Sequence, residues 1–189
     1  MVVPRRGFLA VAGTALAGGV LAACGSSNDD SAGIATETGA ERSSAGSADV
    51  ALLNQALGLE QRLVATYDAA MARLKGSLRR TAQDFHGQER EHADALAQAV
   101  SSLGATPQGA HDRYALPSLP DDAAVLRYAM GVEETAIAQY LDLIPKFSSP
   151  DLRGSMASIL TVEAEHVSVL LQELGSDPVP AAFVRGRAA

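Results

Sequence analysis

An internal repeat constrains the fold of this 189-residue chain more than any other feature. A glutamate followed seven residues later by a tyrosine occurs twice, and so does a Glu-x-x-His segment. The matching residues are Glu60 and Tyr67 with Glu133 and Tyr140, 73 residues later, and Glu89 and His92 with Glu163 and His166, 74 residues later. A repeat of this length indicates two similar structural units that cannot bury their apolar faces alone and must pack together.

The apolar residues around these positions follow the spacing of amphipathic helices. From Asp49 onward they recur every three or four residues in four stripes, over residues 53–74, 78–103, 126–144 and 152–170. The chain has no Trp and only 4 Phe and 4 Tyr, so the core must be mainly aliphatic. The sequence therefore predicts an all-α fold, a four-helix bundle over residues 49–175 that is made of two helical hairpins.

The connection between the two predicted hairpins, Gly104–Pro120, is long for a turn. At about 3.3 Å per residue it is long enough to span a helix of the bundle from end to end. We therefore expect a long crossover along the bundle, which would make the second and fourth helices antiparallel.

Six ionisable residues lie within the apolar stripes: Glu60, Glu89, His92, Glu133, Glu163 and His166. A buried, unpaired carboxylate is strongly unfavourable, and four together would also repel one another. Two divalent metal ions would cancel the four carboxylate charges and leave two neutral histidines as nitrogen ligands. Because residues at i and i+3 share a helix face, each Glu-x-x-His presents an oxygen and a nitrogen to one point. Glu91 and Glu165 point about 100° away from these faces and are expected in solvent.

Residues 50–174 resemble the ferritin-like superfamily, in particular exported bacterial ferritin-like domain proteins. The resemblance rests on one glutamate from each of two helices and a Glu-x-x-His from each of the other two, as in di-iron and di-manganese carboxylate bundles. It implies single-carboxylate ligands at Glu60 and Glu133, paired ligands at Glu89 with His92 and at Glu163 with His166, and two divalent ions, Fe or Mn, as the cofactor. It also places Tyr67 and Tyr140 beside the site. Each is either a core aromatic with a satisfied hydroxyl or a group that serves the ligand carboxylates by hydrogen bonding or radical chemistry.

The N-terminus predicts export. Residues 1–23 have a charged start, an apolar run and small residues, and Arg5 and Arg6 resemble the paired arginines of a twin-arginine signal. Residues 21–24, Leu-Ala-Ala-Cys, resemble a bacterial lipobox in which Cys24 is lipidated; the alternative is ordinary signal cleavage with Cys24 as a bystander. Residues 24–48 contain Ile34 as their only large apolar residue and are expected to form a flexible tether. Residues 176–189 are expected to form a C-terminal tail.

Together these features predict a lipid-anchored protein on the outer face of the cell membrane, with a dinuclear site that meets a small oxidant. The expected reactions are Fe(II) oxidation by oxygen or peroxide, or peroxide removal in the manner of manganese catalases. The alternative is a non-enzymatic envelope protein that binds metal for structure or acts as a helical interaction module. A single Cys excludes a rubredoxin-type electron module within this chain, and the net charge of −7 argues against nucleic acid as a partner. A homo-oligomer is compatible with the sequence.

Overall fold

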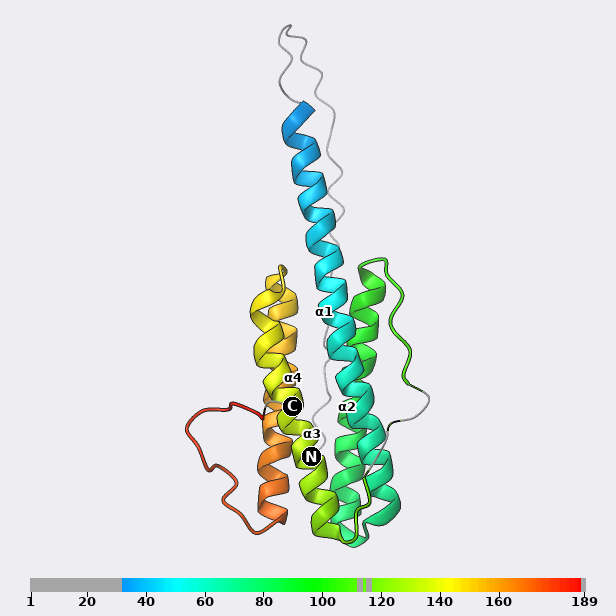
Figure 1. The fold of residues 1–189 in the computed structure, drawn as a ribbon, viewed down its shortest axis with the longest axis vertical. Helices are drawn as coiled ribbons and strands as arrows, with labels where there is room; N and C mark the ends of the chain where they lie inside the picture. Colours follow the sequence, from blue (N-terminus) through cyan, green and yellow to red (C-terminus); the bar gives the residue numbers. More distant parts are fainter. Residues whose placement is uncertain (1–31, 112–113, 115–116, 188–189) are drawn as a thin grey trace, which may run out of the picture.

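The computed structural model describes residues 32–111, 114 and 117–187, and of residues 32–45 the helical path only (Figure 1). The predicted export signal (residues 1–23) and the lipidation site Cys24 lie outside the described residues. The described chain forms the helices α1 (Ala32–Arg73), α2 (Gly76–Ser102), α3 (Asp122–Leu143) and α4 (Pro150–Glu173), with a short 3₁₀ helix, η1 (Ile144–Lys146), between the last two. The predicted all-α class is confirmed.

The ends of the helices follow from local chemistry. The side chain of Asp121 caps α3 by accepting a hydrogen bond from the backbone N–H of Ala124 at 2.7 Å, and Ser149 caps α4 in the same way, with Pro150 as its first residue. Pro145 lies just beyond the last residue of α3, where its missing N–H and its ring prevent the helix from continuing. Side-chain hydrogen bonds also join the two hairpins. Buried Asp49 of α1 accepts hydrogen bonds from Ser148, just before α4.

The segment between α2 and α3 crosses the bundle from end to end (Figure 1). Near its start, Gln108 donates its backbone N–H to Asn54 and accepts a hydrogen bond from Gln61, both on α1. Near its end, the carbonyl of Leu119 accepts a hydrogen bond from Arg73, the last residue of α1. The predicted long crossover is therefore confirmed, and α2 and α4 run antiparallel as expected.

The interior is divided into two apolar clusters with a polar layer between them. One cluster contains Leu63, Tyr67, Phe85 and Leu170, and the other contains Leu57, Leu96, Tyr140 and Ile159. Each of the four helices contributes residues to both clusters. Each also carries one buried glutamate, which lies in the polar layer between the clusters. The bundle thus holds the acidic residues of the internal repeat at mid-height, with hydrophobic packing above and below.

The described chain extends beyond the four-helix bundle at both of its ends. Helix α1 begins at Ala32, so the flexible tether predicted for residues 24–48 is wrong from that point on (Figure 1). Adding residues to a helix that is already packed avoids the unfavourable nucleation step, so a segment with only one large apolar residue, Ile34, can still continue it. The tail after α4 returns to α3, where the backbone N–H of Arg187 donates to the carbonyl of Glu134 at 2.9 Å.

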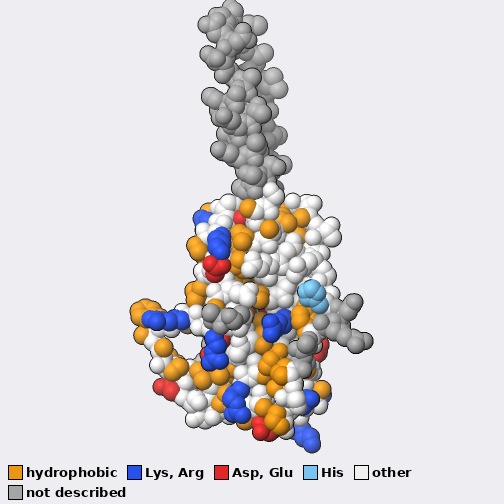
Figure 2. Space-filling model, viewed as in Figure 1, with side chains coloured by type: hydrophobic (Ala, Val, Ile, Leu, Met, Phe, Trp, Pro, Cys, Tyr) orange, Lys and Arg blue, Asp and Glu red, His pale blue; other side chains and the backbone are white. Residues whose placement is uncertain are grey.

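Two properties bear on possible partners. None of the helices within the described residues combines the length and apolar character that a bilayer-spanning helix needs. On the face shown in Figure 2, Lys and Arg side chains are spread over the surface and separated by apolar and uncharged atoms.

Candidate metal centre

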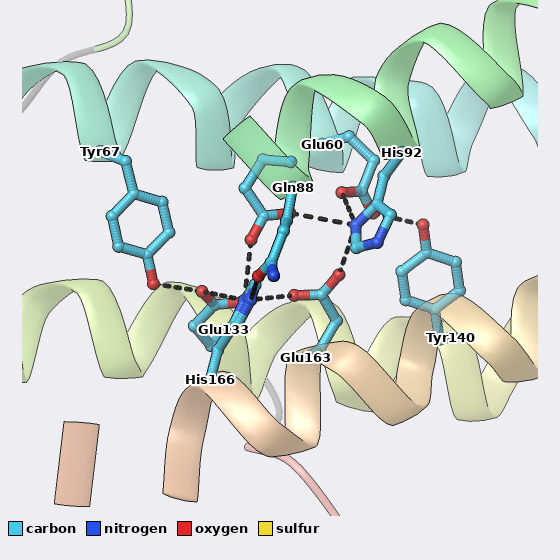
Figure 3. A network of polar contacts seen from close by, with 9 residues as sticks. Glu60, Tyr67, Gln88, His92, Glu133, Tyr140, Glu163 and His166 are labelled. Atoms are coloured by element: carbon cyan, nitrogen blue, oxygen red, sulfur yellow. Dashed lines mark hydrogen bonds and ion pairs between the residues drawn. The ribbon is translucent and has the colours of Figure 1, made fainter. Parts of the chain in front are cut away.

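All six ionisable residues predicted to lie inside the bundle come together in its polar layer (Figure 3). The four glutamates, one from each helix, have fully buried side chains. His166 on α4 is 2% exposed, whereas the side chain of His92 on α2 is 13% exposed. The two acidic neighbours that were expected in solvent, Glu91 and Glu165, are exposed.

The six residues form two groups with the composition of metal sites. One group contains Glu60, Glu89, His92 and Glu163, and the other contains Glu89, Glu133, Glu163 and His166. Within each group, one oxygen or nitrogen atom from every residue lies within 4.8 Å of the others. Glu89 and Glu163 belong to both groups and stand between them. The two groups therefore overlap in two shared carboxylates, and each has one further glutamate and one histidine of its own.

In both groups the histidine turns its Nδ1 atom toward three carboxylates. His92 Nδ1 lies 3.1 Å from Glu163 Oε1, 3.3 Å from Glu89 Oε2 and 3.4 Å from Glu60 Oε2. His166 Nδ1 lies 2.9 Å from Glu89 Oε1, 3.3 Å from Glu133 Oε1 and 3.5 Å from Glu163 Oε2. The internal repeat therefore produces two halves of one site that are related by an approximate twofold arrangement.

Each tyrosine of the repeat reaches across to the other half of the molecule. Tyr67 on α1 donates its hydroxyl proton to Glu133 on α3, and Tyr140 on α3 donates to Glu60 on α1 (Figure 3). Burial, together with the adjacent glutamate, raises the pKa of both phenols well above the ordinary value, so both remain donors. Of the roles expected for these tyrosines, hydrogen bonding to a carboxylate of the site is the one that the geometry supports.

The electrostatics of the layer favour replacing negative charge by protons or cations. Burial raises the pKa of Glu60 and Glu133 well above the usual carboxyl value, and Glu163 adds to both shifts. Burial disfavours the charged form of each histidine, but the facing carboxylates outweigh it. They raise the pKa of His92 to about 12 and that of His166 to about 11. Burial also opposes ionisation of Glu163, yet its hydrogen bonds with both histidines hold its pKa at about 2.

The comparisons with known proteins agree with this geometry. Residues 48–176 match the model of the ferritin-like domain. The chain belongs to the ferritin-like family. This ferritin-like domain covers the bundle from the level of Asp49 to the end of α4, so both groups of the candidate site lie inside it. No curated protein matches the chain.

Solved structures with the same ferritin-like fold come from several bacteria. A conserved hypothetical protein from Mycobacterium tuberculosis is 26% identical, with a TM-score of 0.65 over 74% of this chain and 99% of that one. A ferritin-like, diiron-carboxylate protein from Bacillus anthracis is 21% identical, with a TM-score of 0.62 over 69% of this chain and 97% of that one. A two-domain protein from Anabaena variabilis, which contains DJ-1/ThiJ/PfpI-like and ferritin-like domains, is 19% identical, with a TM-score of 0.61 over 76% of this chain and 42% of that one.

The donor set of this ferritin-like site fits metal ions. Apart from the histidine–carboxylate ion pairs described above, several buried atoms that point into the layer have no hydrogen-bond partner among the residues that the structure describes: Glu60 Oε2, Glu89 Oε1, Glu133 Oε2, both carboxylate oxygens of Glu163 and His166 Nδ1. Buried polar atoms without hydrogen bonds are strongly unfavourable, and in native proteins they call for an explanation such as a bound ion. Carboxylate oxygens and imidazole nitrogens are ligands that suit Fe and Mn.

Two residues of the site were missed by reasoning from the sequence. Gln88 Oε1 lies 2.6 Å from His166 Nε2, and the ring of Phe85 stacks on that imidazole with 3.9 Å between ring centres. Their positions carry a signal, since residues 85, 88, 89 and 92 follow the i, i+3, i+4, i+7 spacing of one helix face. His86, by contrast, lies at the rim of the bundle, where its Nε2 contacts Asp68 at 3.1 Å.

Proposed function

We propose that this ferritin-like domain binds two divalent Fe or Mn ions and uses them in redox chemistry with oxygen or peroxide. The observation that carries the proposal is the pair of carboxylate and histidine groups that share Glu89 and Glu163. Glu60 and His92 would complete the ligands of one ion, and Glu133 and His166 those of the other. Four carboxylates and two neutral imidazoles balance the charge of two divalent ions, so the loaded layer would be neutral.

The residues of the chain have distinct tasks in such a site. Glu89 and Glu163, present in both groups, would hold the two ions close together. Tyr67 and Tyr140 fix one oxygen each of Glu133 and Glu60 by hydrogen bonding, which leaves the other oxygen of each carboxylate for a ligand. The apolar clusters above and below exclude water, which strengthens the electrostatic interactions inside the layer.

The chemistry would come from the bound ions, which supply the electrons that reduce the oxidant. With Fe(II) as substrate, oxidation of two ions reduces one oxygen molecule to hydrogen peroxide with the uptake of two protons. In peroxide removal, two peroxide molecules give one oxygen and two waters. Both reactions need a small oxidant to reach the polar layer. We place its entry beside His92, whose side chain is partly exposed.

Metal titration of a matched pair of variants tests the proposal. Wild-type protein, titrated anaerobically with Fe(II) or Mn(II), should bind about two equivalents and gain melting temperature by mass action. Glu163→Gln removes a charge that both groups share and should lose most of this binding, whereas Glu165→Gln changes an exposed neighbour and should behave as wild type. Equal uptake by Glu163→Gln and wild type, or no uptake by wild type, would rule out the dinuclear site.

Turnover is a separate measurement. After Fe(II) loading, addition of oxygen or peroxide should give Fe(III) absorbance and consumption of the oxidant, both lost in Glu163→Gln. Mn(II)-loaded protein should be assayed for oxygen release from peroxide. Two bound ions without any oxidant consumption would contradict the redox part of the proposal and favour a protein that binds metal without catalysis.

We further propose that the protein is exported and held on the outer face of the cell membrane by a lipid on Cys24. This proposal rests on the paired arginines and the lipobox-like Leu-Ala-Ala-Cys of residues 21–24. The early start of α1 at Ala32 would leave only a short link between that lipid and a helix that projects from the bundle (Figure 1). Cys24→Ser should release the protein from membranes in its host. A variant that still fractionates with membranes after a salt wash would contradict the lipid anchor.

A further inference from the structure

The two halves of the site are not equivalent beyond the residues that face the ions. His166 is held on its far side, where Gln88 Oε1 contacts Nε2 at 2.6 Å and Phe85 stacks on the ring. The offset of 74 residues that relates Glu89 to Glu163 relates Gln88 to Val162 and Phe85 to Ile159. Valine cannot accept a hydrogen bond, so the repeat contains no counterpart of Gln88 at the position that corresponds to it beside His92.

The contact with Gln88 decides which nitrogen of His166 carries a proton. A neutral imidazole has one N–H and one lone pair, and the partner of one nitrogen fixes the state of the other. A Gln88 oxygen that accepts from Nε2–H leaves the lone pair on Nδ1, the atom that lies among Glu89, Glu133 and Glu163. The amide also fixes the plane of the ring, together with Phe85. Outer partners of this kind orient metal-binding histidines and raise their basicity.

We propose that Gln88 is a positioning residue that holds His166 as the Nε2–H tautomer and thereby makes the group around His166 the tighter of two unequal metal sites. The inference rests on the proposed dinuclear site. The group around His92 shares Glu89 and Glu163 and has the same kinds of ligand, but its histidine is more exposed and lacks this partner at the repeat position. The first ion would therefore bind beside His166, and the ion beside His92 would be the one that exchanges more readily with solvent.

Three substitutions separate the hydrogen bond from the bulk of the side chain. Gln88→Met keeps the length and removes the acceptor, Gln88→Asn keeps the amide but is one methylene too short, and Gln88→Glu keeps an acceptor at the original reach. Val162→Met makes a comparable change at the equivalent position of the other half and serves as the control. Far-UV circular dichroism and melting of the metal-free proteins check that all four fold.

Stepwise binding constants for Mn(II), measured anaerobically, give the first readout. Wild type should show two unequal constants. Gln88→Met and Gln88→Asn should weaken the tighter one by about 10- to 100-fold, the range expected for loss of such a partner, and leave the weaker one within about twofold. Gln88→Glu and Val162→Met should leave both within about threefold of wild type.

The second readout is the imidazole proton itself, observed by ¹H–¹⁵N NMR of the protein loaded with diamagnetic Zn(II). Wild type and Gln88→Glu should show a slowly exchanging Nε2–H on His166, assigned through its proximity to the ring of Phe85, whereas Gln88→Met should lose it. A wild type that binds two ions while Gln88→Met leaves both the constants and this proton unchanged overturns the role of Gln88 but not the dinuclear site. A wild type that binds neither Mn(II) nor Zn(II) overturns both.

Discussion

The two helical hairpins, α1–α2 and α3–α4, carry the same polar residues at equivalent positions but differ in what surrounds them. Tyr67 and Tyr140 make the same crosswise hydrogen bond, and Glu60 and Glu133 are equally buried. The surroundings of the two histidines diverge: His166 is enclosed by Phe85 and Gln88, whereas His92 is partly open. The candidate ligands of the layer are therefore arranged symmetrically, whereas the exposure of the two histidines to solvent differs.

The outer surfaces of the two hairpins differ as well. The crossover lies along α1, where Gln108 is hydrogen-bonded to Asn54 and Gln61, whereas α3 is contacted by the C-terminal tail through Arg187. As a result, equivalent positions such as Gly58 and Gly131 have different neighbours. Substitutions at equivalent positions of the two hairpins therefore measure how far the halves are interchangeable.

Truncating the two histidines should give the largest difference. In the metal-free protein, His166→Ala leaves three buried carboxylates without their positive partner, removes the stacking on Phe85 and leaves Gln88 without its contact. Removal of one partner from a buried charged pair lowers the free energy of unfolding by about 3–5 kcal/mol. His92→Ala should lower it by at least about 1 kcal/mol less, because His92 is the more exposed of the two and its removal opens the facing carboxylates to water. Urea unfolding at pH 7 measures both, and equal midpoints would contradict the asymmetry.

The stability of the metal-free protein should fall as the pH rises. The pKa values of His92 and His166 are raised to about 12 and about 11, so above the ordinary value of 6.5 the native state binds more protons than the unfolded state. The raised pKa values of Glu60 and Glu133 act in the same direction from 4.5 upward. The free energy of unfolding therefore decreases with pH over this window. Calorimetry should give a higher melting temperature at pH 6 than at pH 9.

Metal should reverse this dependence, because ligands must lose protons to bind it. Loading two divalent ions is expected to release at least about two protons, one each from His92 and His166, and more from Glu60 and Glu133, whose pKa values burial raises. The melting temperature gained from Mn(II) should thus be larger at pH 9 than at pH 6. Proton release can be measured by indicator titration in weak buffer, and metal uptake without proton release would contradict the protonation of the metal-free layer.

The sequence was sufficient to predict the helices and the residues that gather between them, for a physical reason. An acidic residue within an apolar stripe, repeated in four helices, must be buried together with its counterparts, as Glu60, Glu89, Glu133 and Glu163 are. The contact between Gln88 and His166 could not be predicted as firmly. A polar residue at the edge of an apolar stripe can equally well lie in solvent. The return of the tail to Glu134 depends on a backbone carbonyl, which no sequence pattern marks.

The early start of α1 shows another limit of the sequence. A scarcity of large apolar residues argues against independent folding, and on that ground residues 32–48 are expected to be flexible. It does not argue against extending a helix that is packed further along, from Leu53 to Leu74. The neighbour of Gly58 in the structure is Gln108 of the crossover, a contact that the helix pattern of α1 alone does not indicate.

Replacing each tyrosine by phenylalanine should have similar effects in the two halves. Tyr67→Phe and Tyr140→Phe remove a buried hydroxyl that donates to a glutamate and leave an oxygen of that glutamate without its donor. Leaving a buried acceptor without its donor lowers the free energy of unfolding by about 1–3 kcal/mol. Because both rings are almost completely buried and each makes one such bond, the two values should agree within about 0.5 kcal/mol. A clear difference in chemical denaturation would show that the asymmetry extends to the tyrosine–glutamate pairs.

The smallest effect is expected at Gly58 and Gly131. These two glycines occupy equivalent positions of the repeat but have different surroundings. Both lie within helices, in which Ala is favoured over Gly by about 1 kcal/mol. A Cβ atom at Gly131 would meet nothing within 4 Å, so Gly131→Ala should stabilise the protein by about 0.5–1 kcal/mol. At Gly58 a Cβ atom would lie 2.5 Å from Nε2 of Gln108, so that side chain must move and the gain from Gly58→Ala should be reduced or cancelled.

Gly58→Ala combined with Gln108→Ala should recover the gain that Gly58→Ala alone lacks, measured relative to Gln108→Ala. Equal stabilisation by Gly58→Ala and Gly131→Ala in the otherwise unchanged protein would mean that the crossover does not press on α1 at this point.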